Sequence, residues 1–281
     1  MNSQTRIRVF IGSGEASRIE RKTAIYSLRK NSKRELDVYV FNGTHNSVQL
    51  NDGEPFLAPM SLRVKYQNIT EFSLYRYLIP ELCDYQGRAI YIDSDTVCLS
   101  DIGELLDTPM GDADFLARRD TNPDEERWGL SVMLIDCQRC RFDLEMVVDE
   151  IDAGLYSLTD FSWMGPRFLA YHPYKIGQLD PAWNTFDQCD SRTNLIHYTN
   201  LYMQPWKYPN HPYGELWFNY FNEAMAEGYV TAEDIRLSMI RSYIRRDLLD
   251  GNSKSPQSLV RQLAAPVKKV LKGMASRISI T

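Results

Sequence analysis

Four short and almost continuous apolar runs limit the fold of this chain more than any other feature. They lie at residues 6–12 (RIRVFIG), 36–41 (LDVYVF), 88–92 (RAIYI) and 131–135 (SVMLI). Such runs are typical of strands that are buried on both faces, because a solvated face places polar residues at alternate positions. A segment with helical spacing, reaching Leu28, separates the first two runs. The order β-α-β predicts an α/β fold with a parallel sheet and a right-handed crossover.

Helical spacing recurs in three later segments. Residues 70–82 place apolar side chains on one face, and we expect Pro80 to end that helix. Residues 213–227 and 231–249 predict two more helices, the second capped by Thr231. The intervening residues, from 156 to 213, are rich in aromatics, Pro and Asn and lack a long periodic stretch. They predict loops laid over a sheet edge, where substrates are often held.

The charge of the chain is unevenly distributed. The 281 residues are 43% hydrophobic and 25% charged, which is typical of a globular protein, and the formal net charge is −5. Ten Lys/Arg and only two acids lie from residue 236 onward, so residues 1–235 are strongly acidic. An acidic body argues against nucleic-acid binding. Apolar residues interleaved with lysines at 259–277 instead fit a helix lying on an anionic membrane surface.

The cysteines and the apolar stretches bear on where the protein works. Five scattered cysteines are expected of reduced thiols in a cytoplasmic protein, and a lone Cys137-x-x-Cys140 is expected to be buried at a strand end. No apolar stretch is long enough to span a membrane, and the first residues lack the pattern of a secretory signal. We therefore expect a cytoplasmic protein, peripheral on a membrane at most.

The strongest local signal is Asp93-Ser-Asp95, directly after the apolar run at 88–92. Ligands of open α/β sheets bind where such strands end. Paired carboxylates there can hold a hard divalent cation, which shares its remaining positions with a diphosphate. Alone, the pair fits equally a turn in which both aspartates accept bonds from nearby backbone N–H groups.

Four motifs in order along the chain extend this signal. They are TEFSLYRYLIP at 70–80, YIDSDTV at 91–97, DIGEL at 101–105 and HYTNLYMQPW at 197–206. Over about residues 6–206 the chain resembles the family 8 glycosyltransferases, the relatives of glycogenin and of the lipopolysaccharide galactosyltransferases. The resemblance implies a single nucleotide-sugar transferase domain of the GT-A, Rossmann-like type with a mixed central sheet. We expect this catalytic domain at residues 1–230 and a basic helical segment at 231–281.

The resemblance also implies the roles of individual residues. Asp93, Asp95 and His197 correspond to the ligands of Mn²⁺ or Mg²⁺, and Arg76 to an arginine that contacts the donor sugar or its diphosphate. Asp160 corresponds to an aspartate near the reacting carbon. The positions implied for binding the nucleotide sugar are Phe10, Ile11, Gly12, Arg76, Asp93, Ser94, Asp95, Asn200, Gln204 and Trp206.

Several positions depart from the family pattern. Gly14 and its neighbours stand where relatives commonly have an aspartate, and Gly129-Leu-Ser replaces an Asn-Ala-Gly motif. Asn200 and Gln204 replace a glycine and a lysine near the phosphates, so donor affinity leans more heavily on the metal. The pair Trp183-Asn184 is similar to a family element beside the site. We expect a retaining enzyme that transfers glucose or galactose from a UDP-sugar to a saccharide or glycolipid.

Two other functions remain open on the residues. Asp93-Ser-Asp95-Thr-Val also satisfies the motif of haloacid-dehalogenase-type phosphatases, in which the first aspartate accepts a phosphoryl group in the presence of Mg²⁺. About ninety preceding residues and the absence of a later paired-aspartate motif weigh against it. A non-catalytic sugar-binding relative is the other alternative, which the replaced asparagine and lysine would permit.

Overall fold

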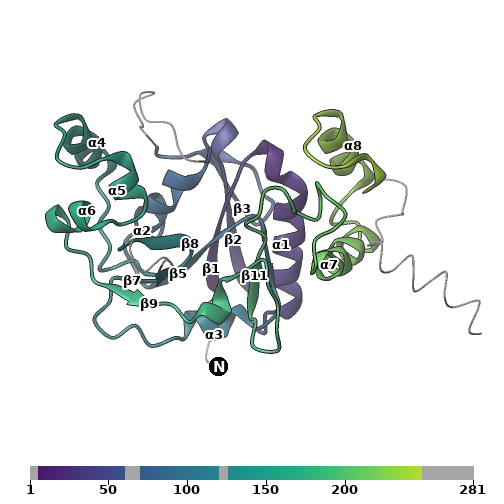
Figure 1. Cartoon of the computed structure of the whole chain (residues 1–281), viewed down its shortest axis with the longest axis horizontal. Helices are drawn as coiled ribbons and strands as arrows, with labels where there is room; N and C mark the ends of the chain where they lie inside the picture. The colour runs from purple at the N-terminus through teal and green to yellow at the C-terminus, as the bar shows by residue number, and fades with distance from the viewer. Residues whose placement is uncertain (1–5, 61–69, 120–125, 249–281) are drawn as a thin grey trace, which may run out of the picture. The chain divides into compact units, whose positions relative to one another are not determined.

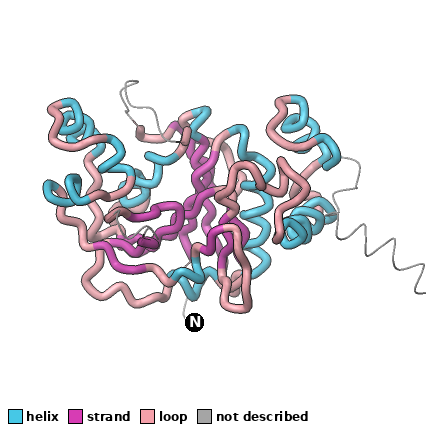
Figure 2. The backbone as a smooth tube through the Cα atoms, viewed as in Figure 1, coloured by secondary structure: helices cyan, strands magenta, loops and turns pink. Residues whose placement is uncertain are grey.

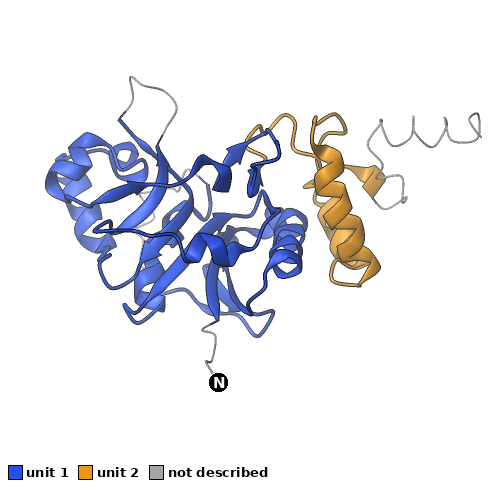
Figure 3. Cartoon of the chain, turned by 90° about the horizontal axis from the view of Figure 1, so that it is seen from below, with its two compact units in different colours: residues 1–197 blue, residues 198–281 orange. Residues whose placement is uncertain are grey.

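The computed structural model describes residues 6–60, 70–119 and 126–248. The chain forms two compact units, residues 1–197 and residues 198–281 (Figure 3). This division follows His197, and the end of the catalytic domain expected near residue 230 stays a prediction. The expected basic helical segment beyond residue 248 lies outside the described residues.

Unit 1 is built on a mixed eight-stranded sheet with the strand order β4-β3-β2-β1-β5-β8-β7-β9 within the described ranges (Figure 1). Its strands are β1 Ile7–Ser13, β2 Leu36–Asn42, β3 Ser47–Leu50, β4 Phe56–Leu57, β5 Arg88–Asp93, β7 Phe115–Arg119, β8 Trp128–Asp136 and β9 Ile176–Gln178. The pairs β1/β2, β1/β5 and β7/β9 are parallel, and the other pairs are antiparallel. All four apolar runs form strands of this sheet. The mixed sheet confirms the fold that the resemblance implied, while the parallel order inferred from β-α-β alone holds for β2, β1 and β5 and is wrong for β8.

Helices flank the sheet on both sides. Figure 1 shows α1 beside the strands on one side and α2 with α4–α6 on the other, and Figure 2 shows the strands gathered between them. The helical elements of unit 1 are η1 Glu15–Ser17, α1 Arg18–Asn31, η2 Gly43–His45, η3 Ser73–Leu78, α2 Ile79–Leu82, α3 Ile102–Leu106, α4 Leu144–Asp152, α5 Leu158–Ser162, α6 Pro166–Tyr171 and η4 Pro181–Trp183. Because both faces are covered, the central strands are buried throughout, as their apolar runs predict.

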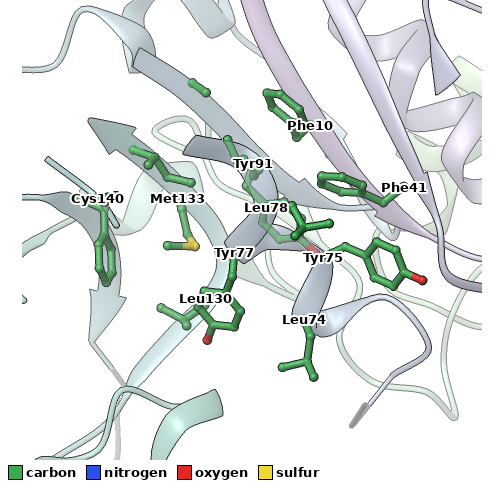
Figure 4. Packing of buried hydrophobic residues seen from close by; sticks show 14 of the residues in the cluster. Phe10, Phe41, Leu74, Tyr75, Tyr77, Leu78, Tyr91, Leu130, Met133 and Cys140 are labelled. Atoms are coloured by element: carbon green, nitrogen blue, oxygen red, sulfur yellow. The ribbon is translucent and has the colours of Figure 1, made fainter. Parts of the chain in front are cut away.

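An aromatic core joins η3 and α4–α6 to one face of the sheet. Phe10 and Phe41 contribute from the strands, and Tyr75 and Tyr77 contribute from η3 (Figure 4). The ring of Tyr77 lies 4.4 Å from that of Phe161, centroid to centroid. This packing fixes η3, and with it the neighbouring Arg76, against the sheet.

The helix expected at 70–82 differs from the structure in one respect. A 3-10 helix, η3, runs to Leu78, and α2 then begins at Ile79, so Pro80 lies in the first turn of a helix instead of ending one. Proline is tolerated there because the first N–H groups of a helix have no intrahelical acceptor. The segment is therefore two short helices that meet just before the proline.

The region expected to be loops contains short elements, which include α5, α6 and a second sheet. That sheet has the order β10-β11-β6, with β6 Thr96–Cys98, β10 Thr185–Phe186 and β11 Leu195–His197. Strands this short leave too little periodicity to be recognised in a sequence. The antiparallel pairing of β11 with β6 sets His197 opposite Thr96, one residue after Asp95. The small sheet thus brings a histidine to the end of β5.

Unit 2 contains α7 Gly214–Ala226, α8 Ala232–Ile240 and η5 Arg246–Leu248. A capping box between Thr231 and Asp234 begins α8, which confirms the expected cap. The helix ends at Ile240, earlier than expected, and Ser242 then takes a left-handed backbone conformation with a φ of 59°. No helix in the described residues has the length and apolarity to cross a membrane. Cys137 and Cys140 are buried free thiols after β8, as expected.

Candidate metal centre

Asp93 and Asp95 occupy the tight turn between β5 and β6. Asp93 is the last residue of β5, and the hydroxyl of Thr96 donates to its carbonyl oxygen at 2.9 Å. The amide of Ser94 donates to the carbonyl of Gly12 on the neighbouring strand at 3.1 Å. These two hydrogen bonds hold both aspartates at the carboxyl end of β5, and α/β sheets bind ligands at such strand ends.

His197 completes a group of three side chains with these aspartates. One ligand atom from each of Asp93, Asp95 and His197 lies within 4.8 Å of the others. The Nε2 atom of His197 is 2.9 Å from Oδ1 of Asp95. Two carboxylates and an imidazole are a donor set that suits Mn²⁺ or Mg²⁺, so the residues fit the cation that the resemblance implies.

Asp93 is oriented by two further side chains. The hydroxyl of Tyr91 donates to Oδ1 of Asp93 at 2.6 Å, and Nη2 of Arg76 lies 3.5 Å from the same oxygen. The guanidinium of Arg76 also lies over the ring of Tyr91, 4.6 Å from its centroid. Arg76 is buried and its Nε donates to the carbonyl of Ser73 at 2.7 Å, so the arginine is held by η3 rather than exposed on a helix surface.

The charges of this group are incompletely balanced. Burial raises the pKa of Asp93, and the charge of Asp95 raises it further against the opposing effect of Arg76. Burial alone would lower the pKa of His197, but attraction to Asp95 and their hydrogen bond outweigh it and raise that pKa. Asp93 therefore holds a proton more strongly than an isolated aspartate, which is expected where a cation of higher charge fits.

Gly12 leaves room for the Tyr91 hydroxyl. A Cβ atom at residue 12 would lie 2.1 Å from the hydroxyl oxygen of Tyr91 and 2.5 Å from Cδ2 of Phe72. Only glycine lets β1 pass this close to the donor that orients Asp93. The side chains of Phe10 and Ile11 are wholly buried in the same strand, so a nucleotide sugar could contact only their backbone. Ser94 is almost wholly buried beside Asp93.

Asp160 lies at the N-terminus of α5. Its Oδ2 accepts from the backbone N–H and the hydroxyl of Ser157, at 2.8 and 2.6 Å, in a capping box. These bonds lower the pKa of Asp160. Asp160 is not part of the group formed by Asp93, Asp95 and His197.

The remaining sequence-predicted residues belong to unit 2. Oδ1 of the exposed Asn200 accepts from the backbone N–H of Tyr202 at 3.0 Å. Gln204 is buried and donates to the carbonyl of Tyr198 at 3.1 Å. Trp206 is wholly buried, with its ring centroid 5.5 Å from that of Trp217. Within this unit, Gln204 and Trp206 are parts of its interior.

Two residues that contact Asp93 or His197, Tyr91 and Asn184, were not predicted as site residues. Tyr91 could have been found, because residues two apart on a strand share a face and Tyr91 precedes Asp93 by two. Asn184 has its Oδ1 atom 3.0 Å from Nδ1 of His197. It was noted only as part of a family element, and its partner lies on another strand, so periodicity does not reveal the contact.

The mixed α/β sheet, with two carboxylates at the end of β5 and a histidine brought beside them by β11, matches the fold of the GT-A glycosyltransferases. Residues 19–148 match the model of glycosyl transferase family 8. This part of the chain is similar to family 8, and the chain is a glycosyltransferase, as its four motifs predicted.

Comparisons with known proteins find a similar sequence and similar folds. Protein CDI of Arabidopsis thaliana is 27% identical over 196 residues, which are 59% of this chain and 70% of that protein. The galactosyltransferase LgtC, solved with donor and acceptor sugar analogues, matches with a TM-score of 0.59 at 13% identity, over 82% of this chain and 99% of LgtC. At this identity the likeness shows a shared fold.

Two larger glycosyltransferases have similar folds. The match to GlyE of Streptococcus pneumoniae TIGR4 has a TM-score of 0.55 at 15% identity and covers 80% of this chain and 64% of GlyE. The match to the bifunctional glycosyltransferase WbbM has a TM-score of 0.53 at 17% identity and covers 79% of this chain. It spans only half the length of the WbbM chain.

Proposed function

We propose that this glycosyltransferase transfers glucose or galactose from a UDP-sugar to a hydroxyl of a saccharide or glycolipid, with retention of anomeric configuration. A divalent cation, Mn²⁺ or Mg²⁺, is held by Asp93, Asp95 and His197. The observation that carries the proposal is the meeting of these three side chains within 4.8 Å. The galactosyltransferase activity named for LgtC supports the choice of sugar.

The side chains around the site have separable tasks in this proposal. The bound cation would supply Lewis-acid stabilisation of the charge that develops on the departing diphosphate. Tyr91 and Arg76 hold the carboxylate of Asp93 in one orientation. Arg76 also contributes a buried positive charge at the end of β5, which favours a phosphorylated donor at that edge.

The bonding of Asp160 supports front-face transfer. Oδ2 of Asp160 caps α5, which makes this carboxylate a poor nucleophile. In front-face transfer the acceptor oxygen bonds to the anomeric carbon on the side from which the phosphate oxygen departs, and that phosphate oxygen takes the acceptor proton. We keep Asp160 as a residue near the reacting carbon, so that Asp160→Asn should lower turnover without changing UDP affinity.

Calorimetry of UDP binding with and without Mn²⁺ tests the proposal directly. We expect UDP to bind at least tenfold more tightly with the metal, and a screen of UDP-sugars with Mn²⁺ to release UDP in the presence of a saccharide acceptor. A protein that binds UDP equally well without metal would contradict the metal assignment. Rapid Mg²⁺-dependent hydrolysis of simple phosphate esters, with no UDP release, would instead support the phosphatase hypothesis.

We further propose that residues 1–230 are the catalytic part and that residues 231–281 attach it to an anionic membrane surface on the cytoplasmic side. The excess of lysine and arginine from residue 236 onward supports this part of the proposal. Truncation at Gly251 should end binding to liposomes that contain anionic lipid and leave activity on soluble acceptors intact. Unchanged liposome binding would exclude the attachment.

A further inference from the structure

The side-chain amide of Asn184 is bonded at both ends inside unit 1. Its Oδ1 lies 3.0 Å from Nδ1 of His197, and its Nδ2 donates to the hydroxyl oxygen of Ser131 at 3.1 Å. Asn184 is wholly buried, so water does not replace either partner. In the structure the amide oxygen faces the imidazole and the amide nitrogen faces Ser131, so both ends of the buried amide are bonded.

The main chain of Asn184 is also held in place. Its N–H donates to the carbonyl of Pro181 at 3.0 Å, and its carbonyl accepts from the guanidinium of Arg118. The following strand, β10, pairs with β11 so that Phe186 lies beside His197, and their rings are 5.8 Å apart in an edge-on contact. Neither the amide nor the imidazole can rotate without breaking several of these contacts.

This orientation determines which nitrogen of His197 carries the proton when the imidazole is neutral. An amide oxygen can only accept a hydrogen bond, so the proton of a neutral imidazole resides on Nδ1. In that form Nε2 has the lone pair that a metal ion needs, whereas without a metal a proton on Nε2 makes the 2.9 Å contact with Asp95. A reversed amide would donate to Nδ1 and place the proton on Nε2, which would prevent that nitrogen from binding a metal.

We propose that Asn184 is a positioning residue that keeps Nε2 of His197 available as a metal ligand, with its amide nitrogen bonded to Ser131. The inference rests on the proposed metal function of Asp93, Asp95 and His197, and deepens it by assigning the group behind the histidine. Partners of this kind typically change metal affinity by 10–100-fold when they are removed.

Two substitutions of similar size separate positioning from packing. Asn184→Asp keeps an oxygen acceptor for Nδ1, whereas Asn184→Leu fills the same space without one. We expect Mn²⁺, titrated calorimetrically into the full chain, to bind Asn184→Asp within a few-fold of wild type and Asn184→Leu roughly 10–100-fold more weakly. Thermal unfolding should rank the two variants the other way, because a buried carboxylate costs more than a buried leucine.

Asn194→Ala is the matched control. Oδ1 of Asn194 accepts from the hydroxyl of Ser100 at 2.9 Å, directly before β11, and takes no part in holding the imidazole. The Asn194→Ala variant should leave Mn²⁺ affinity unchanged. The inference is overturned if Asn184→Leu binds Mn²⁺ within threefold of wild type, or if Asp and Leu weaken binding equally.

Nitrogen NMR of the imidazole tests the same inference without any metal. The chain has four histidines, and a His197→Gln variant identifies the signals of residue 197. In metal-free protein we expect Nδ1 of His197 to carry a proton in wild type and in Asn184→Asp, beside the Nε2–H that bonds to Asp95, and to lose that proton in Asn184→Leu. An unchanged form in the leucine variant would refute the positioning role. Failure of wild-type protein to bind Mn²⁺ would refute the proposed metal function alone.

Discussion

In the described part of unit 1, Nε2 of a histidine lies within hydrogen-bond distance of a carboxylate oxygen at two places, and their surroundings differ. His197 lies 2.9 Å from Asp95, with the second carboxylate of Asp93 close by. His172 lies 2.6 Å from Glu150, whose same oxygen also accepts from the hydroxyl of Tyr156. The first group gathers two carboxylates, whereas the second surrounds one carboxylate with two donors.

The pKa values move in opposite directions in the two groups. Hydrogen bonding from Tyr156 lowers the pKa of Glu150, with His172 adding to the effect, whereas burial raises that of Asp93. Within the Glu150 group, Tyr156 and His172 both bond to the carboxylate of Glu150. These bonds connect α4 to the residue that follows α6. The Asp93 group sets a second carboxylate beside Asp95 and His197, and such a pair of acids is where a cation fits. The number of carboxylates therefore separates a structural histidine–carboxylate contact from a ligand-binding one.

The largest expected effect comes from Asp95→Asn, which removes one of the paired charges. We expect metal-dependent turnover to be lost and Mn²⁺ affinity to fall by more than the roughly 100-fold that an outer partner can cost. Circular dichroism should show an intact fold, because the side chain is partly exposed at a turn. Glu150→Gln is the matched control and should bind Mn²⁺ normally. Near-normal turnover in Asp95→Asn would remove the distinction between the two groups.

Gly12→Ala alters the first group without changing any charge. The new methyl group would overlap the Tyr91 hydroxyl, so Tyr91 must move away from Asp93. We expect unfolding to require about 1–3 kcal/mol less free energy and Mn²⁺ to bind more weakly. Urea unfolding and calorimetry measure the two effects. Gly129→Ala is the control, since its Cβ would meet Arg118 O at an ordinary 3.5 Å; equal losses in both variants would argue against a role for Tyr91.

Glu150→Gln should affect stability alone. It replaces a charged acceptor by an amide that cannot serve both Tyr156 and His172 equally well. We expect a loss of about 1–2 kcal/mol in the free energy of unfolding, measured with urea near neutral pH. Tyr156→Phe should produce a similar loss through the same oxygen. A change in Mn²⁺ affinity in either variant would show that the two groups are coupled.

Lowering the pH should produce the smallest of these effects, and it should act on the Glu150 group. The pKa of Glu150 is lower in the folded chain than its ordinary value of 4.5, so the unfolded chain binds more protons over that interval. The stability contributed by Glu150 is present above pH 4.5 and is lost as pH falls through the folded pKa. Urea unfolding between about pH 6 and about pH 3 should show a shallower loss in Glu150→Gln, by roughly 1 kcal/mol or less. Identical slopes would contradict the lowered pKa.

The central strands and part of the site were predictable from sequence because their signals are local. Apolar runs mark β1, β2, β5 and β8, and the Asp93-Ser-Asp95 turn follows β5 directly. The direction of β8 was not predictable, because parallel and antiparallel buried strands share one side-chain pattern. Nor was the acceptor behind His197, since the Asn184 contact depends on how the two-residue strand β10 pairs with β11.

The pairing of β11 with β6 also has a consequence for how the protein matures. Asp95 and His197 are about 100 residues apart in sequence, and a closed loop of that length is entropically costly to form. During synthesis both aspartates leave the ribosome long before the histidine does. The three side chains therefore come together only after β11 has paired with β6. A metal would then bind late, and only to chains in which this part of unit 1 has folded.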